Sequence, residues 1–264
     1  MTNDTTAPLA VVTGASTGIG RALAAELVER GYDVVIAAEE PAIHAAAAEL
    51  SRDGRTVTPV QVDLATAQGV EQLARTAQEQ GAPVDAVILN AGVGVGGRFD
   101  QTPLEDELHL IDLNVRSTIH LAKLLLPDLV ARGDGRILVT SSIAAVAPGP
   151  YHATYAASKA FVHSFAEGIR EELKDTGVTV TSLMPGPTET EFFSRADMED
   201  TKIGQMEDKD DPADVAREGV EAMLKGRSSV VGGSFANRIQ AELGTHLPDA
   251  LATPLMARMT KPQD

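Results

Sequence analysis

The sequence predicts an α/β fold in which helices cover both faces of a doubly wound parallel sheet, giving three layers. Short apolar runs alternate with helical patterns along the chain, as is typical of right-handed βαβ crossovers. Hydrophobic residues make up 43% of the 264 residues but aromatic residues only 3%, so Ala, Val, Leu and Ile must form the core. Such a core suits buried parallel strands. No boundary demands a second unit, so we expect a single domain over residues 1–264.

Composition excludes several classes of function. A formal net charge of −16 argues against nucleic acid as a partner, because binding phosphates requires clustered Lys and Arg. The absence of Cys excludes disulfides, thiolate metal sites and Cys nucleophiles. No apolar stretch approaches the ~18 residues of a membrane span, and residues 1–8 lack the pattern of a secretory signal. We therefore expect a soluble cytoplasmic protein without a metal site.

The first strand, expected over residues 9–13, leads into the run Gly14-Ala15-Ser16-Thr17-Gly18-Ile19-Gly20 and a helix over 21–30. Gly14 permits a tight turn, Gly18 lets backbone N–H groups approach a pyrophosphate, and Gly20 allows close packing of the helix. The N-terminus of a helix also favours an anion. This pattern predicts a dinucleotide site, with an ordinary turn carrying chance glycines as the alternative.

The second strand, expected over residues 32–38, ends where such folds meet the adenosine ribose. Glu39 and Glu40 follow it, with no Arg or Lys nearby. A carboxylate accepts a hydrogen bond from a ribose 2′-hydroxyl and repels a 2′-phosphate, so NAD is favoured over NADP. Alternatively, both glutamates cap and solubilise the start of the next helix.

Two polar segments follow later strands of the same half. Asp63, with Leu64, follows the third strand, and the Asp side chain either meets the adenine edge or caps the helix after it. The glycines of 93–97 are not followed directly by a helix, so they indicate a loop beside the cofactor and not a second phosphate site. The elements expected here are a helix over 41–52, a strand over 56–62, a helix over 67–80 and a strand over 86–89.

A buried amide and two hydroxyls stand out in the next stretch. Asn114 lies among apolar residues of a long helix expected over 102–127, where it is either a satisfied core amide or holds a water in a proton path. Ser141 and Ser142 end a strand expected over 136–140, at the edge where parallel sheets gather ligands.

Tyr155 and Lys159 stand four residues apart in a helix expected to run to about residue 175, so they share one face. An ammonium beside the phenol would lower the pKa of Tyr155 from its usual value of about 10 and allow proton transfer near neutral pH. A surface Tyr beside a solvated Lys is the alternative interpretation.

The last third of the chain carries fewer signals. Residues 187–211 are polar and acidic and predict either a lid over a site or a disordered linker. Residues 233–264 form an extension that covers a substrate pocket, a neighbouring subunit or nothing. The elements expected are a strand over 178–184, a helix from Asp211-Pro212 to residue 224, an edge strand over 229–231 and a weak amphipathic helix near 236–243.

Taken in order, these motifs resemble those of the single-domain short-chain dehydrogenase/reductase family. Thr13–Gly20 is similar to that family's TGxxxGxG, Asn90-Ala91-Gly92 to its NAG, and Tyr155-to-Lys159 to its YxxxK. Ser142 precedes Tyr155 by the usual thirteen residues (155 − 142). Asn114 falls at the position of the family's Asn, and Pro185-Gly186 with Thr190 matches PGxxxT. The resemblance covers residues 8–232 and implies a Rossmann-like fold.

The resemblance also implies the roles of the site residues. Tyr155 would exchange a proton with a secondary alcohol or ketone, Ser142 would bind the substrate oxygen, Lys159 would hold the nicotinamide ribose, and Asn114 would anchor a water. The expected cofactor contacts are Gly14, Ser16, Thr17, Gly18, Ile19, Gly20, Glu39, Asp63, Leu64, Asn90, Ala91, Gly92, Tyr155, Lys159, Pro185, Gly186, Thr188 and Thr190.

Two features of the resemblance bear on cofactor and assembly. Family members that prefer NAD tend to carry Asp at the position of Ala38, and those that prefer NADP carry Arg at that of Glu39; this chain has neither. We therefore expect an NAD(H)-dependent oxidoreductase, with an NADP-linked 3-oxoacyl-type reductase or a catalytically silent dinucleotide sensor as alternatives.

A homodimer or homotetramer is implied by the resemblance. Phe161, Phe165 and Ile169 are compatible either with that interface or with packing on the sheet.

Overall fold

The computed structural model describes residues 7–52, 54–234 and 247–263 and contains one seven-stranded parallel sheet. The strands are ordered β3-β2-β1-β4-β5-β6-β7. The chain therefore runs outward from β1 in one direction through β2 and β3, and in the other from β4 to β7. This reversal confirms the doubly wound sheet, and the crevice outside β1 and β4 is where such sheets place ligands. The strands are β1 (Leu9–Thr13), β2 (Asp33–Ala38), β3 (Val57–Gln61), β4 (Val84–Leu89), β5 (Gly135–Thr140), β6 (Val178–Pro185) and β7 (Ser229–Gly232).

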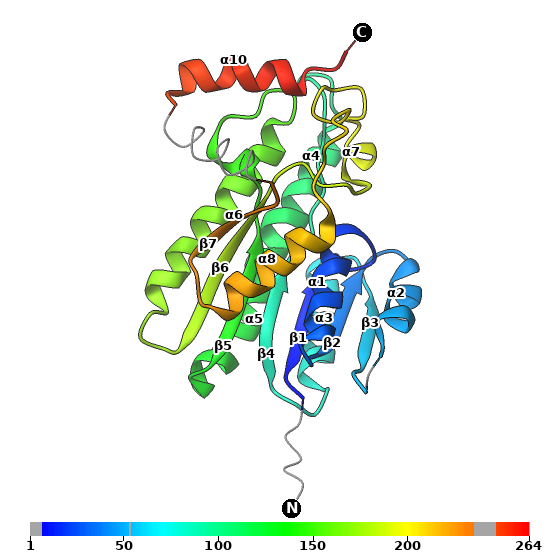
Figure 1. Cartoon of the computed structure of the whole chain (residues 1–264), viewed down its shortest axis with the longest axis vertical. Helices are drawn as coiled ribbons and strands as arrows, with labels where there is room; N and C mark the ends of the chain where they lie inside the picture. The colour runs from blue at the N-terminus through cyan, green and yellow to red at the C-terminus, as the bar shows by residue number, and fades with distance from the viewer. Residues whose placement is uncertain (1–6, 53, 235–246, 264) are drawn as a thin grey trace, which may run out of the picture.

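Helices cover both faces of the sheet, as the alternating pattern predicts (Figure 1). In β1, Leu9 and Val11 are buried with α3, α5 and α6, whereas Ala10 and Val12 are buried with α1, α2 and α8. Because successive strand residues point to opposite faces of the sheet, one apolar strand contributes side chains to the hydrophobic cores on both faces. The helices are α1 (Gly18–Glu29), α2 (Ala42–Leu50), α3 (Ala67–Gln78), α4 (Leu104–Ile111), α5 (Ser117–Arg132), α6 (Ala153–Glu172), α7 (Phe192–Arg195), α8 (Pro212–Leu224) and α10 (Asp249–Thr260).

The prediction of one long helix over residues 102–127 is wrong in two respects. It is divided into α4 and α5 by a π-helical turn, Asp112–Arg116, and α5 continues past Pro127 to Arg132. Pro127 removes one helical hydrogen bond, but the buried Leu125 and Leu129 on either side of it hold the helix against the sheet. Gly133, at φ 73°, then ends α5 in the left-handed conformation that favours glycine.

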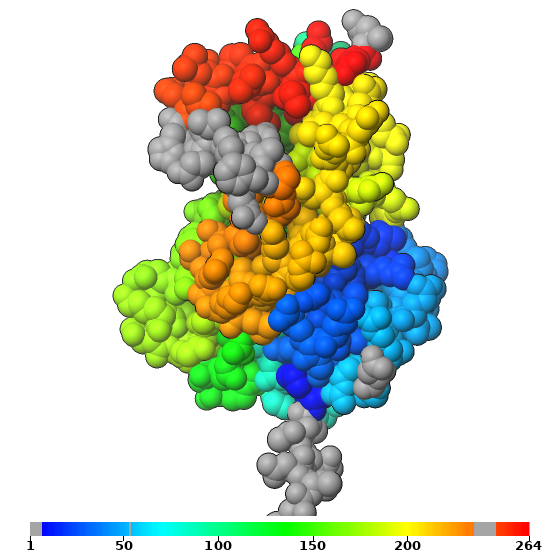
Figure 2. Space-filling model, viewed as in Figure 1, coloured from blue at the N-terminus to red at the C-terminus, as the bar shows by residue number. Residues whose placement is uncertain are grey.

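The end of the chain contains a helix that the sequence did not indicate. For the extension over residues 233–264 we expected only a weak helix near 236–243. The structure instead shows α10, which includes Pro254 and lies at the end of the molecule toward which the strands point (Figure 1). In the space-filling view α10 (red) and residues near 200 (yellow) together cover that end (Figure 2). The helix expected near 236–243 lies outside the described residues. Within the described part of the chain, no helix combines the length and apolarity needed to cross a membrane.

Candidate active site

A cleft of ≈330 Å³ runs along the carboxyl ends of the strands. All eighteen residues that the sequence indicates as cofactor contacts line it, and so does Ser142. Asn114 does not line the cleft; it is 2% exposed and lies behind the wall. The topology therefore gathers motifs that are up to 176 positions apart (190 − 14) into one cavity.

The glycine turn between β1 and α1 fits a pyrophosphate. A Cβ on Gly20 would lie 2.0 Å from the Gly14 carbonyl oxygen, and Gly14 and Gly18 have φ values of +67° and +56°. Only glycine allows the helix to approach the strand so closely in this conformation. Helix α1 begins at Gly18, three residues earlier than expected, and Thr17 makes no side-chain cap, so backbone N–H groups of the first turn remain for an anion.

Thr13 and Asn90 fasten this turn to the neighbouring strand. The Thr13 hydroxyl accepts hydrogen bonds from the backbone N–H groups of Asn90 (2.8 Å) and Ala91 (2.9 Å). The Asn90 amide donates to the carbonyl oxygens of Thr13 (3.0 Å) and Gly14 (3.3 Å). Asn90 thus holds the glycine turn in shape. Thr13 lies within the motif, but its role depends on a contact between strands that sequence spacing does not reveal.

The two glutamates after β2 differ in their surroundings. Glu39 is exposed, and in the part of the chain described here its carboxylate has no hydrogen-bond or ion-pair partner. Glu40 accepts a hydrogen bond from the Ser16 hydroxyl (2.7 Å) and pairs with Arg195 (2.5 Å). The alternative that both glutamates cap the next helix is wrong, because Pro41 occupies the N-cap of α2 and no side chain caps that helix.

Asp63 lines the cleft and also holds its own turn. Its carboxylate accepts a hydrogen bond from the Ala65 N–H (2.8 Å). The N-cap of α3 is instead Thr66, whose hydroxyl accepts from the Gly69 N–H (3.1 Å). The expectation that Asp63 caps the helix is therefore wrong. Asp63 instead lies on the cleft wall, where its side chain can contact a ligand.

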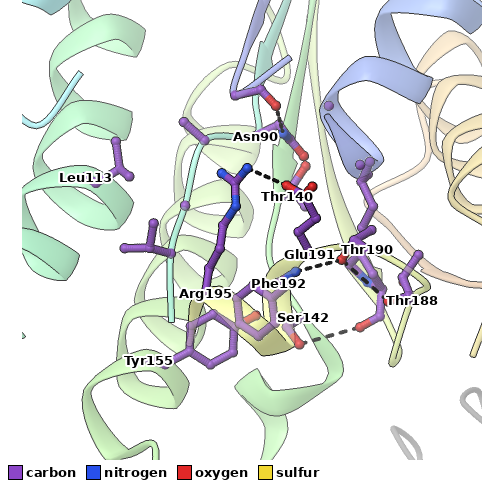
Figure 3. A pocket seen from close by; sticks show the side chains of 18 of the residues that line it. Asn90, Leu113, Thr140, Ser142, Tyr155, Thr188, Thr190, Glu191, Phe192 and Arg195 are labelled. Atoms are coloured by element: carbon purple, nitrogen blue, oxygen red, sulfur yellow. Dashed lines mark hydrogen bonds and ion pairs between the residues drawn. The ribbon is translucent and has the colours of Figure 1, made fainter. Parts of the chain in front are cut away.

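Tyr155, Ser142 and Phe192 lie near one another in the cleft (Figure 3). Lys159 lines the same cleft. The Lys159 ammonium donates to the Thr140 carbonyl oxygen (3.0 Å) and lies 5.7 Å from the centroid of the Tyr155 ring. Ser142 caps a short 3₁₀ turn, where its hydroxyl accepts from the Ala144 N–H (3.1 Å). The Phe192 ring lies 5.0 Å from that of Tyr155. Lys159 is buried and Tyr155 is half-buried, and both line the cleft, so the alternative of a surface Tyr beside a solvated Lys is wrong.

The electrostatics of this pair differ from the expectation. Burial raises the pKa of Tyr155 to about 12, and a hydrogen bond with Ser142 only partly opposes it. Burial also lowers the pKa of Lys159 to about 8. The predicted lowering of the Tyr155 pKa is wrong for the protein alone, because the ammonium faces the ring and the Thr140 carbonyl while desolvation disfavours the phenolate.

Asn114 occupies the π-helical turn between α4 and α5. Its amide nitrogen donates to the Val93 carbonyl (2.9 Å) and the Ser158 hydroxyl (3.0 Å), and its Oδ1 accepts from the Val93 N–H (2.9 Å). These contacts tie the loop after β4 to α6. A Cβ on Gly92 would lie 3.1 Å from both the Asn114 oxygen and the Lys159 ammonium, so these two groups share one small space.

Residues 187–211 are ordered, not a disordered linker. Backbone hydrogen bonds link Asp210 with Pro187 (2.9 Å) and Glu189 (2.9 Å), which closes the base of the segment. Inside it, Phe193, Ala196 and Met198 form a small core of their own. The segment therefore stands as a folded unit over the cleft.

The glycines of 93–97 let this segment pack closely. A Cβ on Gly94 would lie 2.7 Å from the Phe192 ring, and one on Gly96 would lie 2.5 Å from the Met198 side chain. The Gly96 N–H also donates to the Ala196 carbonyl (2.7 Å). This cluster forms a loop against residues 187–211.

Several lining residues were missed from the sequence because they come from segments without a motif. Met256 and Thr260 of α10 line the cleft, and the Thr260 hydroxyl donates to the Pro150 carbonyl (2.8 Å). His152 also lines it and is 5% exposed, and burial lowers its pKa to about 4. The extension therefore contributes to the pocket wall. Residues 187–211 add further lining side chains that the sequence did not indicate: Glu191, Phe192, Phe193, Arg195, Met198 and Ile203.

Comparison with known proteins agrees with this architecture. The family model described as short chain dehydrogenase matches residues 8–200. An uncharacterized oxidoreductase of Myxococcus xanthus is 37% identical over 184 residues, covering 69% of this chain and 73% of the relative. A short-chain dehydrogenase of Sphingobium yanoikuyae, solved in complex with NADPH, is 27% identical with a TM-score of 0.80 and covers 97% of this chain and 98% of that one.

A second solved structure supports the fold alone. A short chain dehydrogenase/reductase of Burkholderia phymatum, in complex with NAD, has a TM-score of 0.82 at 24% identity and covers 98% of both chains. With the seven-stranded parallel sheet, the glycine turn and the Ser142, Tyr155 and Lys159 side chains in one cleft, the family match over residues 8–200 identifies the chain as a member of the short-chain dehydrogenase/reductase family of oxidoreductases.

Proposed function

We propose that this protein is an NAD(H)-dependent oxidoreductase that interconverts a secondary alcohol and a ketone. The observation that carries the proposal is the convergence of Tyr155, Lys159 and Ser142 in a cleft whose other end is a glycine turn. The turn would suit a dinucleotide because glycine at position 20 lets α1 approach the Gly14 backbone closely, and no side chain caps the first turn of α1, whose N–H groups could face a pyrophosphate. The bound nicotinamide would supply or accept the hydride.

The side chains of the cleft account for the remaining steps of ketone reduction. Both Ser142 and Tyr155 line the cleft. Ser142 would hydrogen-bond the substrate oxygen, and Tyr155 would donate its proton to that oxygen as hydride reaches the carbon. The charge of Lys159 then stabilises the phenolate that remains. Alcohol oxidation runs the same transfers backward, with the Tyr155 oxygen as the base. Asn114 would hold Val93 and Ser158 in place through its hydrogen bonds. We also propose that Asn114 anchors a water.

An apolar substrate suits the walls of the cleft near Tyr155. Phe192 stacks at a tilt against the Tyr155 ring, and Met198 and Met256 line the same cavity. Apolar lining with a few placed polar groups is typical of pockets for small hydrophobic ligands. A hydrophobic ketone or secondary alcohol is therefore the proposed substrate class.

NAD(H) is proposed as the preferred cofactor on the charge of the adenosine end. Glu39, Glu40 and Asp63 line that end, and three carboxylates oppose a 2′-phosphate. The Sphingobium relative was solved with NADPH, so the preference rests on this chain's own acidic residues. The cysteine-free composition is compatible with our proposal of a cytoplasmic enzyme.

We also propose a homodimer or homotetramer. Leu104 and Leu108 of α4, Ile119 of α5 and Phe161 of α6 are exposed apolar side chains. Phe161 stacks on Phe165 (6.3 Å between ring centroids), whereas Phe165 and Ile169 pack against the core. Light scattering after size-exclusion chromatography gives the assembly, and a monomer at micromolar concentration would contradict this part.

The direct test is a titration with NADH and NADPH followed by a ketone and alcohol screen at several chain lengths. The proposal expects tighter binding of NADH and turnover that increases with the apolar length of the ketone. Tighter NADPH binding with turnover of 3-oxoacyl substrates would favour the NADP-linked reductase instead. Tight NADH binding without turnover of any carbonyl would indicate a dinucleotide sensor.

A further inference from the structure

The ion pair between Glu40 and Arg195 joins two parts of the cofactor cleft that are 155 positions apart in sequence. Arg195 Nη1 lies 2.5 Å from Glu40 Oε1, and its Nη2 lies 2.5 Å from Glu191 Oε2. The other oxygen of Glu40 accepts the hydrogen bond from Ser16 (2.7 Å). One guanidinium is thus held by two carboxylates, and one of these is fixed to the glycine turn.

The position of this network identifies the part of a dinucleotide that it faces. Glu40 follows the carboxyl end of β2 by two residues, and Ser16 belongs to the turn after β1. In doubly wound sheets the adenosine ribose binds at the carboxyl end of the second strand. Arg195, although it comes from α7, therefore lies at the ribose end of the cleft and not at the Tyr155 end.

Arg195 supplies the positive charge at the ribose end of the cleft, and this charge indicates which ligand group it could bind. Among the described residues that line the cleft, Lys159 and Arg195 are the only Lys or Arg side chains, and Lys159 is held at the Thr140 carbonyl. A guanidinium pairs well with a phosphate monoester, because its planar donors match the phosphate oxygens. In this structure the carboxylates of Glu40 and Glu191 already occupy the guanidinium donors. Their combined charge of two negative units is larger than the single positive charge of Arg195.

We infer that Glu40 masks Arg195 and thereby determines cofactor choice: the masked guanidinium offers nothing to a 2′-phosphate, and removing the Glu40 charge exposes a phosphate-binding site. This inference rests on the proposed function and assigns its cofactor preference to Glu40. The sequence-based expectation drew the NAD preference from Glu39 and Glu40 together and named only Glu39 as a cofactor contact. The exposed Glu39, without a partner in the described chain, serves as the natural control.

The test measures dissociation constants for NADH and NADPH by cofactor fluorescence, without substrate, in the wild type and in matched variants. Glu40→Gln keeps a partner for Ser16 but removes the charge. A new charge-assisted hydrogen bond to phosphate corresponds to about tenfold tighter NADPH binding, while NADH binding changes by less than about threefold. Adding Arg195→Gln to Glu40→Gln should abolish the gain, and raising the salt concentration should weaken it.

Two further variants make the outcome specific. Glu39→Gln removes a carboxylate from the same end of the cleft without unmasking a guanidinium, so it should tighten NADPH binding by a smaller factor than Glu40→Gln. Glu191→Gln removes the second carboxylate from Arg195 and should also tighten NADPH binding by a smaller factor than Glu40→Gln. The inference is overturned if Glu40→Gln fails to tighten NADPH binding, if the gain persists in the double variant, or if Glu39→Gln gives the same gain. Glu191→Gln tests the same masking if Glu40→Gln does not fold.

Failure of the proposed function has a different signature. Wild type that binds neither dinucleotide rejects the proposed function, and the inference falls with it. Wild type that binds NADPH more tightly than NADH rejects the NAD preference and the masking, but leaves the oxidoreductase. Wild type that prefers NADH, with no effect of Glu40→Gln and Glu191→Gln, rejects the masking alone.

Discussion

The Lys159 ammonium lies 5.7 Å from the centroid of the Tyr155 ring and is hydrogen-bonded to the Thr140 carbonyl oxygen at the end of β5. This carbonyl positions the ammonium beneath the face of the phenol. The geometry lets the charge act on a phenolate once the proton has left, although burial keeps the phenol protonated beforehand. Under the proposed function, Tyr155 would donate a proton to the ketone, and the charge of Lys159 would stabilise the phenolate that remains.

Tyr155→Phe removes the proton donor and leaves the ring in place. Under the proposed mechanism we expect turnover to fall by about 10²- to 10⁴-fold, the range that general acid–base catalysis contributes. The dissociation constant for NADH should stay within about twofold, because the phenol oxygen is not part of the glycine turn. Steady-state kinetics and fluorescence titration measure the two quantities. Turnover close to that of the wild type would reject Tyr155 as the donor.

The pH dependence of ketone reduction should follow Lys159. Burial raises the pKa of Tyr155 to about 12, so the donor stays protonated throughout the neutral range. The pKa of Lys159 is about 8, so its charge is present below pH 8 and is lost above it. We expect kcat/KM to be constant up to about pH 7.5 and to fall as the pH rises through 8.

Lys159→Arg provides the control for that profile. A guanidinium has an ordinary pKa above about 12, so a folded variant with residual activity should show no fall near pH 8. Thermal unfolding followed by circular dichroism checks that the variant is folded. A wild-type profile that stays level to pH 10, or a variant with the same fall near pH 8, would contradict the assignment to Lys159.

The strands and the motifs that follow them could be predicted from the sequence for a physical reason. The strands β1, β4 and β5 consist mainly of apolar residues. Gly14 and Asn90 come directly after β1 and β4, and Ser142 follows the end of β5 by two residues. A parallel sheet places all such positions at one edge, so knowledge of local pattern suffices to bring them together. Local chemistry of this kind also predicted that a helix starts at Asp211-Pro212, where the Asp211 carboxylate accepts a hydrogen bond from the Ala213 N–H and caps α8.

The parts that escaped prediction depend on contacts between distant segments. Arg195 reaches Glu40 across 155 positions, and Met256 enters the cleft from a helix that contains a proline. The π-helical turn at Asn114 is likewise set by bonds to Val93 and Ser158. The pKa of Tyr155 depends on the balance of desolvation and charge, which residue spacing alone does not give.

Gly20→Ala tests the glycine turn directly. The added Cβ would lie 2.0 Å from the Gly14 carbonyl oxygen, which belongs to the backbone, so the helix and the strand must move apart. Forcing atoms into a packed site typically costs about 1–3 kcal/mol of stability. We expect this loss in urea unfolding, together with at least a tenfold weaker affinity for NADH as the turn changes shape.

Gly168→Ala is the matched control, because a Cβ there meets nothing within 4 Å. Gly168 lies inside α6, where alanine is favoured over glycine by about 1 kcal/mol. This variant should be slightly more stable and should bind NADH like the wild type. Equal NADH binding by both variants would show that the turn does not hold the dinucleotide.

The buried His152 should make the folded protein less stable in acid. This contribution can be measured apart from those of the other titratable groups. Burial lowers its pKa from 6.5 to about 4, so between these values the unfolded chain binds a proton that the folded chain does not. Stability from this group is complete above pH 6.5 and declines as the pH falls toward 4. Between pH 7 and pH 4.5 the loss amounts to about 2 kcal/mol, from the free energy of one pKa unit.

His152→Leu should remove that component, because the variant has no imidazole to protonate. The test compares urea unfolding at pH 7 and pH 4.5: the wild type should lose about 2 kcal/mol more than His152→Leu over this interval, while the carboxylates contribute equally to both and cancel. His44→Leu changes an exposed histidine on α2 and should keep the wild-type pH dependence. If His152→Leu loses as much stability as the wild type, the acid sensitivity arises elsewhere and His152 accepts a proton in the folded state.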